Sequence, residues 1–137
     1  MQPPPAAWHT PRMDRTAIRR LEEIADRAWP AFETDRGTDW EARFSHGMHR
    51  RINSATVWSA EDLAATVERL EQWYREREAP AIFKVTAASA PGLDDVLAGR
   101  GYRPDARVTI MTAPVDRPGP HAGVEIHSHP TGEWRDA

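Results

Sequence analysis

The residues best suited to bind a ligand form one cluster of donors near the middle of the chain. Its members are Arg43, Arg50, Arg51, Asn53 and Ser54. Guanidinium groups donate paired hydrogen bonds to carboxylates, so the cluster predicts a surface that holds a carboxylate or orients a substrate amine. The alternative is a solvated strand face, on which Glu41 pairs across to an arginine and Asn53 hydrogen-bonds local backbone. Both interpretations stay open at the level of sequence.

The histidines raise the question of a metal site. Glu125, His127 and His129 alternate along one side of a short candidate strand, and three such groups can ligate zinc. The surrounding sequence is rich in proline and glycine and offers no groups to orient such ligands, so no metal is predicted. His46 and His49 flank a turn without an identified partner and are expected at the surface.

Other catalytic arrangements are not evident. The chain has no cysteine, which excludes disulfides, thiolate nucleophiles and zinc–thiolate sites. Ser54 does not lie in a nucleophile-elbow motif. Asp94 and Asp95 fall in the first turn of a predicted short helix, where negative charge is favoured by the helix dipole. Glu22 and Glu23 are expected on a solvated helix face. No catalytic residue is therefore assigned.

Composition limits the kinds of partner. The 137 residues suit one domain, with 18 basic and 21 acidic side chains interspersed and a net charge of −3. Without a basic stripe or polybasic tract, neither nucleic acid nor a membrane is predicted as a partner. Lys84 is the only lysine. The N-terminal residues do not resemble a signal peptide, and no apolar run of about 20 residues occurs. The absence of cysteine fits a reducing compartment, so a cytoplasmic location is expected.

The hydrophobic spacing predicts the elements that would position the cluster. A first helix begins at Arg12 or Arg15 and ends at Ala28, with Thr10 or Asp14 as its cap. Two alternating strands follow, over 39–44 and 50–57, and the Gly47 turn between them predicts an antiparallel hairpin. The cluster described above lies on this hairpin.

The rest of the chain continues the alternation of helices and strands. A second helix is capped by Ser59 and closed by Pro80. The further predicted elements are a strand over 81–86, a helix over 91–99 with Gly101 as its left-handed cap, and a strand over 107–113. The order α-β-β-α-β-α-β predicts an α+β fold, a mostly antiparallel sheet with helices packed on it.

Composition also suggests the domain organisation. Residues 1–11, with three consecutive prolines, are predicted to be a disordered leader, and residues 12–115 to be the domain. Residues 116–137 are predicted to be a linker or the start of a further half, with one more strand over 124–127.

Several short motifs follow one another in a definite order over residues 21–115. They are Trp29-Pro30, Trp40-x-x-Arg43, Gly47, Arg50-Arg51-x-Asn53-Ser54, Trp73-Tyr74, Phe83-Lys84-Val85-Thr86, Leu93-Asp94-Asp95-x-Leu97, Arg100-Gly101-Tyr102 and Met111-Thr112-Ala113. In their order and spacing these motifs resemble the N-terminal half of bacterial two-part GNAT-family N-acetyltransferases. The resemblance implies a half-GNAT-like fold and a relation to enzymes that transfer an acetyl group from acetyl-coenzyme A to an amine.

The motif that binds the cofactor in this family has no counterpart here. GNAT enzymes hold the coenzyme A pyrophosphate in an Arg/Gln-x-x-Gly-x-Gly/Ala loop between a strand and a helix, where free amides face the phosphates. The only Gly-x-Gly in this chain, Gly99-Arg100-Gly101, falls at the predicted end of a helix. No cofactor is therefore expected in this chain, and acetyl-coenzyme A is expected only in a complete family member.

Two functions follow as expectations. The first is a GNAT-related protein that supplies the substrate side or a structural half without its own acetyl-coenzyme A site. The second is a non-enzymatic binding or dimerisation module that pairs with a second copy or a partner domain through edge strands. Residues 109–113 and 124–127 are the candidate edges.

Overall fold

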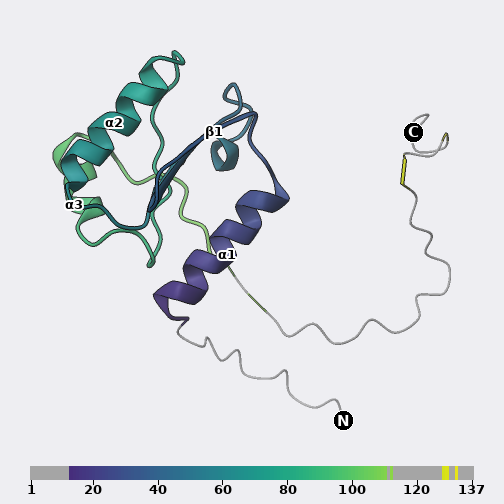
Figure 1. The fold of residues 1–137 in the computed structure, drawn as a ribbon, viewed down its shortest axis with the longest axis horizontal. Helices are drawn as coiled ribbons and strands as arrows, with labels where there is room; N and C mark the ends of the chain where they lie inside the picture. Colours follow the sequence, from purple (N-terminus) through teal and green to yellow (C-terminus); the bar gives the residue numbers. More distant parts are fainter. Residues whose placement is uncertain (1–12, 111, 113–127, 130–131, 133–137) are drawn as a thin grey trace, which may run out of the picture. The chain divides into compact units, whose positions relative to one another are not determined.

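The computed structural model describes residues 13–110, 112, 128–129 and 132 (Figure 1). Two compact units divide the chain, Met1–Pro104 and Asp105–Ala137, and each is described by itself. The predicted leader and the predicted strand over 124–127 lie outside the described residues, as does the predicted linker over 116–137 except for 128–129 and 132. Among the described residues, no helix is long and apolar enough to cross a membrane.

Helix α1, Arg15–Ala28, begins where a capping residue satisfies its first amides. The Asp14 carboxylate accepts a hydrogen bond from the Ala17 amide at 2.8 Å, and the Trp29 amide closes the last turn on the Ala25 carbonyl. The start at Arg15 and the Asp14 cap are thus confirmed. The other predicted cap, Thr10, lies outside the described residues.

Three strands form one antiparallel sheet in the order β1-β2-β3. They are β1, Glu33–Arg36; β2, Trp40–Phe44; and β3, Ala55–Val57. Strand β1 was not predicted, because its four residues are all polar and show no hydrophobic alternation. A tight turn pairs it with β2, and there the Trp40 indole lies so close over Gly37 that a Cβ would meet its Nε1 at 2.3 Å.

The second predicted strand is correct only at its end. Residues Arg50–Ile52 form a 3-10 helix, η1, and pairing with β2 is confined to β3. The Asn53 side chain explains the difference, since its Oδ1 accepts hydrogen bonds from the Ser45 and Gly47 amides at 2.7 and 3.1 Å. These bonds hold the chain in a wide turn, with φ of 73° at Gly47, instead of extending the hairpin.

Helix α2, Leu63–Arg75, begins at a different cap from the one predicted. The Asp62 carboxylate accepts a hydrogen bond from the Ala65 amide at 2.9 Å. Ser59 cannot fill this role, because it lies three residues before the capping position, and its amide donates to the Asp39 carbonyl. The buried face of α2 carries Val67, Leu70 and Tyr74.

The apolar core lies between one face of the sheet and helices α2 and α3. Helix α3, Leu93–Gly99, contributes Leu93 and Leu97 to it, and in Figure 1 both helices lie on the same side of the strands. The sheet contributes the small side chains Ala42, Ala55 and Val57. Small residues on the strands let the helices approach closely and pack without voids.

The predicted strand over 81–86 is reduced to a single parallel bridge between Ala55 and Phe83. The Ala55 amide donates to the Ile82 carbonyl and the Lys84 amide donates to the Ala55 carbonyl, each at 2.8 Å. Pairing stops there because the chain turns at Thr86, whose amide donates to the Ser89 hydroxyl.

In the second unit, the predicted strand over 107–113 is wrong for the residues that the structure describes, 107–110 and 112. Val108 and Ile110 are 60 % and 63 % exposed. A period-two hydrophobic pattern makes a strand only where a neighbouring strand supplies hydrogen bonds. The α+β class with an antiparallel sheet is confirmed, whereas the element order gains β1 and loses this strand.

Candidate functional site

The two faces of the sheet differ in chemistry. Trp40, Ala42, Ala55 and Val57 face the apolar core, whereas the opposite face carries Arg36, Glu41, Arg43 and Thr56. We call this second set the polar face. Glu41 lies opposite both Arg36 and Thr56 in the strand register, so three of its members are direct cross-strand neighbours.

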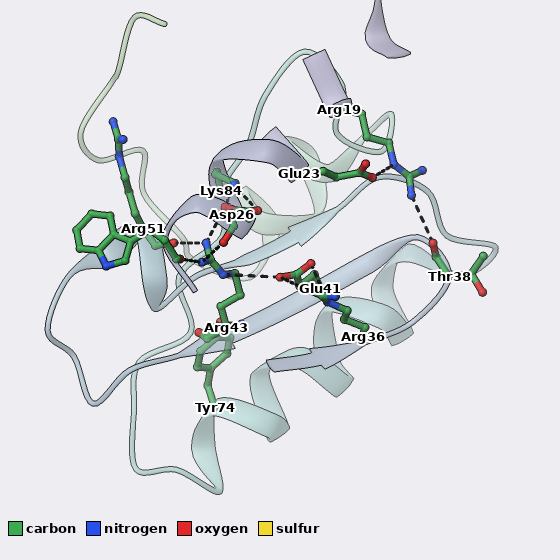
Figure 2. Close-up of polar contacts among 11 residues, drawn as sticks. Arg19, Glu23, Asp26, Arg36, Thr38, Glu41, Arg43, Arg51, Tyr74 and Lys84 are labelled. Atoms are coloured by element: carbon green, nitrogen blue, oxygen red, sulfur yellow. Dashed lines mark hydrogen bonds and ion pairs between the residues drawn. The ribbon is translucent and has the colours of Figure 1, made fainter. Parts of the chain in front are cut away.

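Arg43 lies at the centre of the polar face and is buried, with 4 % of its side chain exposed. Its Nη1 donates to Asp26 Oδ1 at 2.6 Å and to the Arg51 carbonyl at 2.9 Å. Its Nη2 donates to the Asp26 carbonyl at 3.0 Å and also to the Trp29 carbonyl. Both Nη atoms of this predicted substrate-binding residue are therefore engaged within the protein (Figure 2).

Two further contacts hold Arg43. Its Nε lies 3.7 Å from Glu41, beside it on the polar face. From the core side, the Tyr74 hydroxyl donates to the Arg43 carbonyl at 2.9 Å and accepts from its amide. Burial of the Tyr74 phenol raises its pKa above the ordinary value, so this hydroxyl keeps its proton.

Lys84 joins the same network from the segment that bridges to β3. Its ammonium lies 2.9 Å from Glu22 Oε2 and 3.0 Å from both oxygens of Asp26. Glu22 is only 6 % exposed, so the prediction of a solvated face is wrong for this residue. Its charge is tolerated because Lys84 neutralises it directly.

Sequence reasoning missed Glu22, Asp26 and Lys84 as a unit. One signal was available, since Glu22 and Asp26 are four residues apart and so lie on one face of a helix. Their partner is the only lysine of the chain, and it follows an apolar segment. Only the tertiary fold brings that lysine to α1.

Asn53 and Ser54 of the predicted cluster are buried. The Asn53 Oδ1 accepts hydrogen bonds from the Ser45 and Gly47 amides, and its Nδ2 donates one to the His49 carbonyl at 2.7 Å. Its carboxamide therefore satisfies local backbone, as one of the two interpretations expected. The same interpretation placed Glu41 in a cross-strand ion pair, and Glu41 does pair with Arg36, at 3.1 Å.

Arg50 and Arg51 are the exposed members of the predicted cluster and lie on η1. The Arg51 side chain points away from Arg43, while its carbonyl accepts from Arg43 (Figure 2). The five residues are thus divided into a buried set of three and a surface pair. A role of the cluster in substrate binding stays a prediction.

A cleft of about 210 Å³ opens beside this network, between α1 and the polar face. Arg19, Glu23, Asp26 and Arg27 line it from α1. Arg19 is fixed by hydrogen bonds to Glu23 and Asp39, each at 2.9 Å, and these bonds raise its pKa above the ordinary value. The α1 wall is therefore highly charged and partly preorganised.

The sheet supplies the opposite wall of the cleft. Arg36, Trp40, Glu41, Thr56 and Trp58 line it there. The Arg19 guanidinium lies 5.6 Å from the centre of the Trp58 ring. The cleft thus combines charges of both signs, a hydroxyl and the indole ring of Trp58, the mixture expected of a site for a small polar ligand.

The Gly99-Arg100-Gly101 segment has the geometry of a helix C-terminus. The amides of Arg100, Gly101 and Tyr102 all donate to carbonyls of the last turn of α3, and Gly101 has a φ of 87°. The predicted glycine cap is confirmed. These amides are therefore already hydrogen-bonded within the protein.

Comparison with known proteins places the chain in a family. Residues 15–137 match the family described as "Probable histone acetyltransferase Rv0428c C-terminal". The chain belongs to this acetyltransferase-related family. The resemblance to acetyltransferases that the motifs predicted is therefore confirmed at the level of the family.

Two longer proteins are similar to this member of the family. An "Uncharacterized N-acetyltransferase YobR" of Bacillus subtilis (strain 168) is 34% identical over 98 residues, which cover 70% of this chain and 39% of that protein. A "Probable histone acetyltransferase Rv0428c" of Mycobacterium tuberculosis is 29% identical over 118 residues, which cover 86% of this chain and 37% of that protein. The chain thus spans less than two fifths of each relative. No solved structure matches it significantly.

Proposed function

We propose that this chain is a GNAT-related, acetyltransferase-like protein that supplies the substrate side or a structural half and has no acetyl-coenzyme A site of its own. The names of its relatives support acetyl-transfer chemistry in general. The observation that carries the finer proposal is the chemistry of the junction between β3 and α2.

This junction is where a strand leads into a helix, the setting in which a pyrophosphate loop needs free amides and positive potential. Here it contains no glycine, and Glu61 and Asp62 come directly before the helix. The Asp62 carboxylate already caps the Ala65 amide, and the Trp58 and Ser59 amides donate to the Asp39 carbonyl. Two acidic side chains and occupied amides oppose binding of a phosphate at this position.

The substrate side of the proposal rests on the surface pair Arg50 and Arg51. Both arginines are exposed on η1, next to the buried Arg43 network that fixes the backbone of this loop. A guanidinium on a fixed backbone can hold a carboxylate with less loss of entropy than one on a mobile loop. We therefore assign substrate contacts to these two and a supporting role to Arg43, Asn53 and Ser54.

Isothermal titration calorimetry of acetyl-coenzyme A against this chain tests the proposal. We expect no saturable heat of binding at cofactor concentrations up to about 1 mM. Any dissociation constant would then exceed about 1 mM, so the binding free energy would be weaker than about 4 kcal/mol. Unacetylated coenzyme A serves as the control for weak, non-specific contact of the nucleotide. Micromolar binding of acetyl-coenzyme A would show that the chain has a cofactor site and would overturn the proposal.

The alternative function, a dimerisation or binding module, has its own supporting observation. Val108 and Ile110 are exposed in a β-prone segment, and β1 pairs on only one side within the described residues. Exposed edges of this kind favour pairing with a second copy or a partner domain. Sedimentation equilibrium distinguishes the two proposals, because a strict monomer at high micromolar concentration contradicts self-association.

A further inference from the structure

We propose that the cleft between α1 and the polar face binds a small zwitterion, an organic molecule that carries one ammonium and one carboxylate group. This inference does not rest on the function proposed above. The cleft is distinct from the surface pair Arg50 and Arg51, which do not line it.

The first argument is a buried hydroxyl without a partner. Thr56 is only 2 % exposed and lines the cleft, and among the described residues its hydroxyl makes no hydrogen bond. No fully buried side-chain oxygen or nitrogen of the described residues lacks a partner. The Thr56 hydroxyl must therefore open on the cleft, where a ligand or water satisfies it.

The second argument is the charge of the lining. Three arginines, Arg19, Arg27 and Arg36, and three carboxylates, on Glu23, Asp26 and Glu41, face the same volume. Their formal charges cancel, so the cleft attracts neither a net cation nor a net anion strongly. A ligand with both charges can be complementary to both sets at once.

The third argument assigns an end of the ligand to each region. Glu41 and Thr56 are cross-strand neighbours, so a carboxylate and a hydroxyl lie side by side where an ammonium can donate to both. Glu41 lies between Arg36 and Arg43, which fix its orientation (Figure 2). Arg27 is exposed and has no ion pair among the described residues, so it is available for the ligand carboxylate.

Size and spacing narrow the class of ligand. The cleft volume of about 210 Å³ is many times the space that a single water needs, and it suits a molecule of amino-acid size. Among the described residues, no group of three acidic or histidine side chains is placed to hold a metal ion. The Trp58 ring offers an apolar wall for the carbon chain of such a molecule.

The test is an NMR titration with unbranched ω-amino acids, from 3-aminopropanoate to 6-aminohexanoate. We expect one chain length to saturate the protein and to shift the amide signals of Glu41, Thr56 and Trp58. The matching n-alkylamine and n-alkyl carboxylate should each bind at least about tenfold more weakly, because each can satisfy only one charged region. The proposal is overturned if no member saturates, or if the amine or the carboxylate alone binds as tightly as the zwitterion.

Three variants locate the site. Arg27→Gln should weaken binding of the best probe by about tenfold, since it removes a charge-assisted hydrogen bond. Arg20→Gln is the matched control, because Arg20 is an exposed arginine two turns away on α1 that does not line the cleft. Thr56→Val should weaken binding without lowering the unfolding midpoint. Equal effects of Arg20→Gln and Arg27→Gln, or unchanged binding to Thr56→Val, would contradict the assignment.

Discussion

Arg43 connects three separate parts of the first unit through one side chain. Its guanidinium reaches the end of α1 at Asp26 and Trp29, the η1 turn at Arg51, and Glu41 on its own strand. Carbonyls at a helix C-terminus carry partial negative charge, so a cation there is favourable. Arginine suits this position better than lysine because its planar fork reaches several acceptors at fixed angles.

Replacing Arg43 should therefore destabilise the protein strongly. Arg43→Met leaves buried carbonyls without donors and Asp26 with one cation fewer, for an expected loss of about 3–5 kcal/mol in the free energy of unfolding. Urea unfolding followed by circular dichroism measures this change. Arg51→Met is the matched control, since its side chain is exposed, and should change stability by less than about 0.5 kcal/mol. A loss below about 1 kcal/mol for Arg43→Met would contradict the role given to the network.

Lys84 should be a poor target for chemical acetylation in the folded protein. Its ammonium is held by Glu22 and both oxygens of Asp26, and it must leave these partners before its nitrogen can attack. With an N-hydroxysuccinimide ester of acetate, we expect Lys84 to react on the order of tenfold more slowly in the folded than in the urea-unfolded chain. Peptide mass spectrometry gives both rates. Equal rates would mean that the ammonium is not sequestered.

At the scale of elements, local signals predicted the helices and tertiary contacts decided the rest. Helices α1 and α3 were predicted closely because their apolar spacing and end signals lie within the segment itself. Strand β1 was missed because its polar residues are ordered by pairing with β2. The first half of the strand predicted over 50–57 was wrong because the Asn53 side chain competes for the backbone of the turn.

The candidate site shows the same division. The arginines and Asn53 were identifiable by residue type, but which of them are buried could not be read from the sequence. Arg43 is buried because Asp26 comes to it from α1, and that contact needs the helix to cross the polar face. Thr56 carried no sequence signal, since its importance comes from the position of one hydroxyl in a cleft.

An acid-sensitive contact joins α2 to the end of α3. Glu71 on α2 accepts hydrogen bonds from the Arg100 guanidinium at 3.0 Å and from the Tyr102 hydroxyl at 3.1 Å. The bond from Arg100 holds the pKa of Glu71 below its ordinary value of 4.5. Burial, together with the bond to Glu71, raises the pKa of Tyr102 to about 12, so its hydroxyl remains a donor across the physiological range.

The direction of this shift sets a pH dependence. A carboxyl whose folded-state pKa is depressed adds stability above its unfolded-state pKa, and this stability is lost as the pH falls through the folded-state value. We therefore expect Glu71→Gln to be less stable than the natural protein near about pH 7, with the difference shrinking below about pH 4.5. Urea unfolding at a series of pH values measures it. Glu68→Gln, one turn earlier and exposed, is the control, and a pH-independent difference for Glu71→Gln would contradict the assignment.

At the scale of the whole first unit, the two sides of the sheet are held by different forces. Helices α2 and α3 pack on it through apolar side chains, whereas α1 meets the opposite face through Arg43, Lys84 and their acidic partners. The only fully buried residue of α1 is Glu22. Its predicted apolar stripe is only partly covered, with Ile24 45 % exposed. Apolar burial supplies most of the stability of packed helices, so α1 is expected to be the less firmly held helix.

This difference predicts that α1 opens independently of the core. In native-state hydrogen exchange followed by NMR, amides in the middle of α1 should exchange faster than those of α2, because fewer apolar contacts must break. Asp26→Asn should accelerate exchange in α1 further, since it weakens the bonds to both Arg43 and Lys84, and should leave α2 almost unchanged. Glu23→Gln is the matched control, because Glu23 is a more exposed carboxylate on the same helix, and its one ion pair among the described residues is with Arg19. Equal acceleration of both helices by Asp26→Asn would mean that the unit opens as a whole, and that the polar network contributes to one cooperative core.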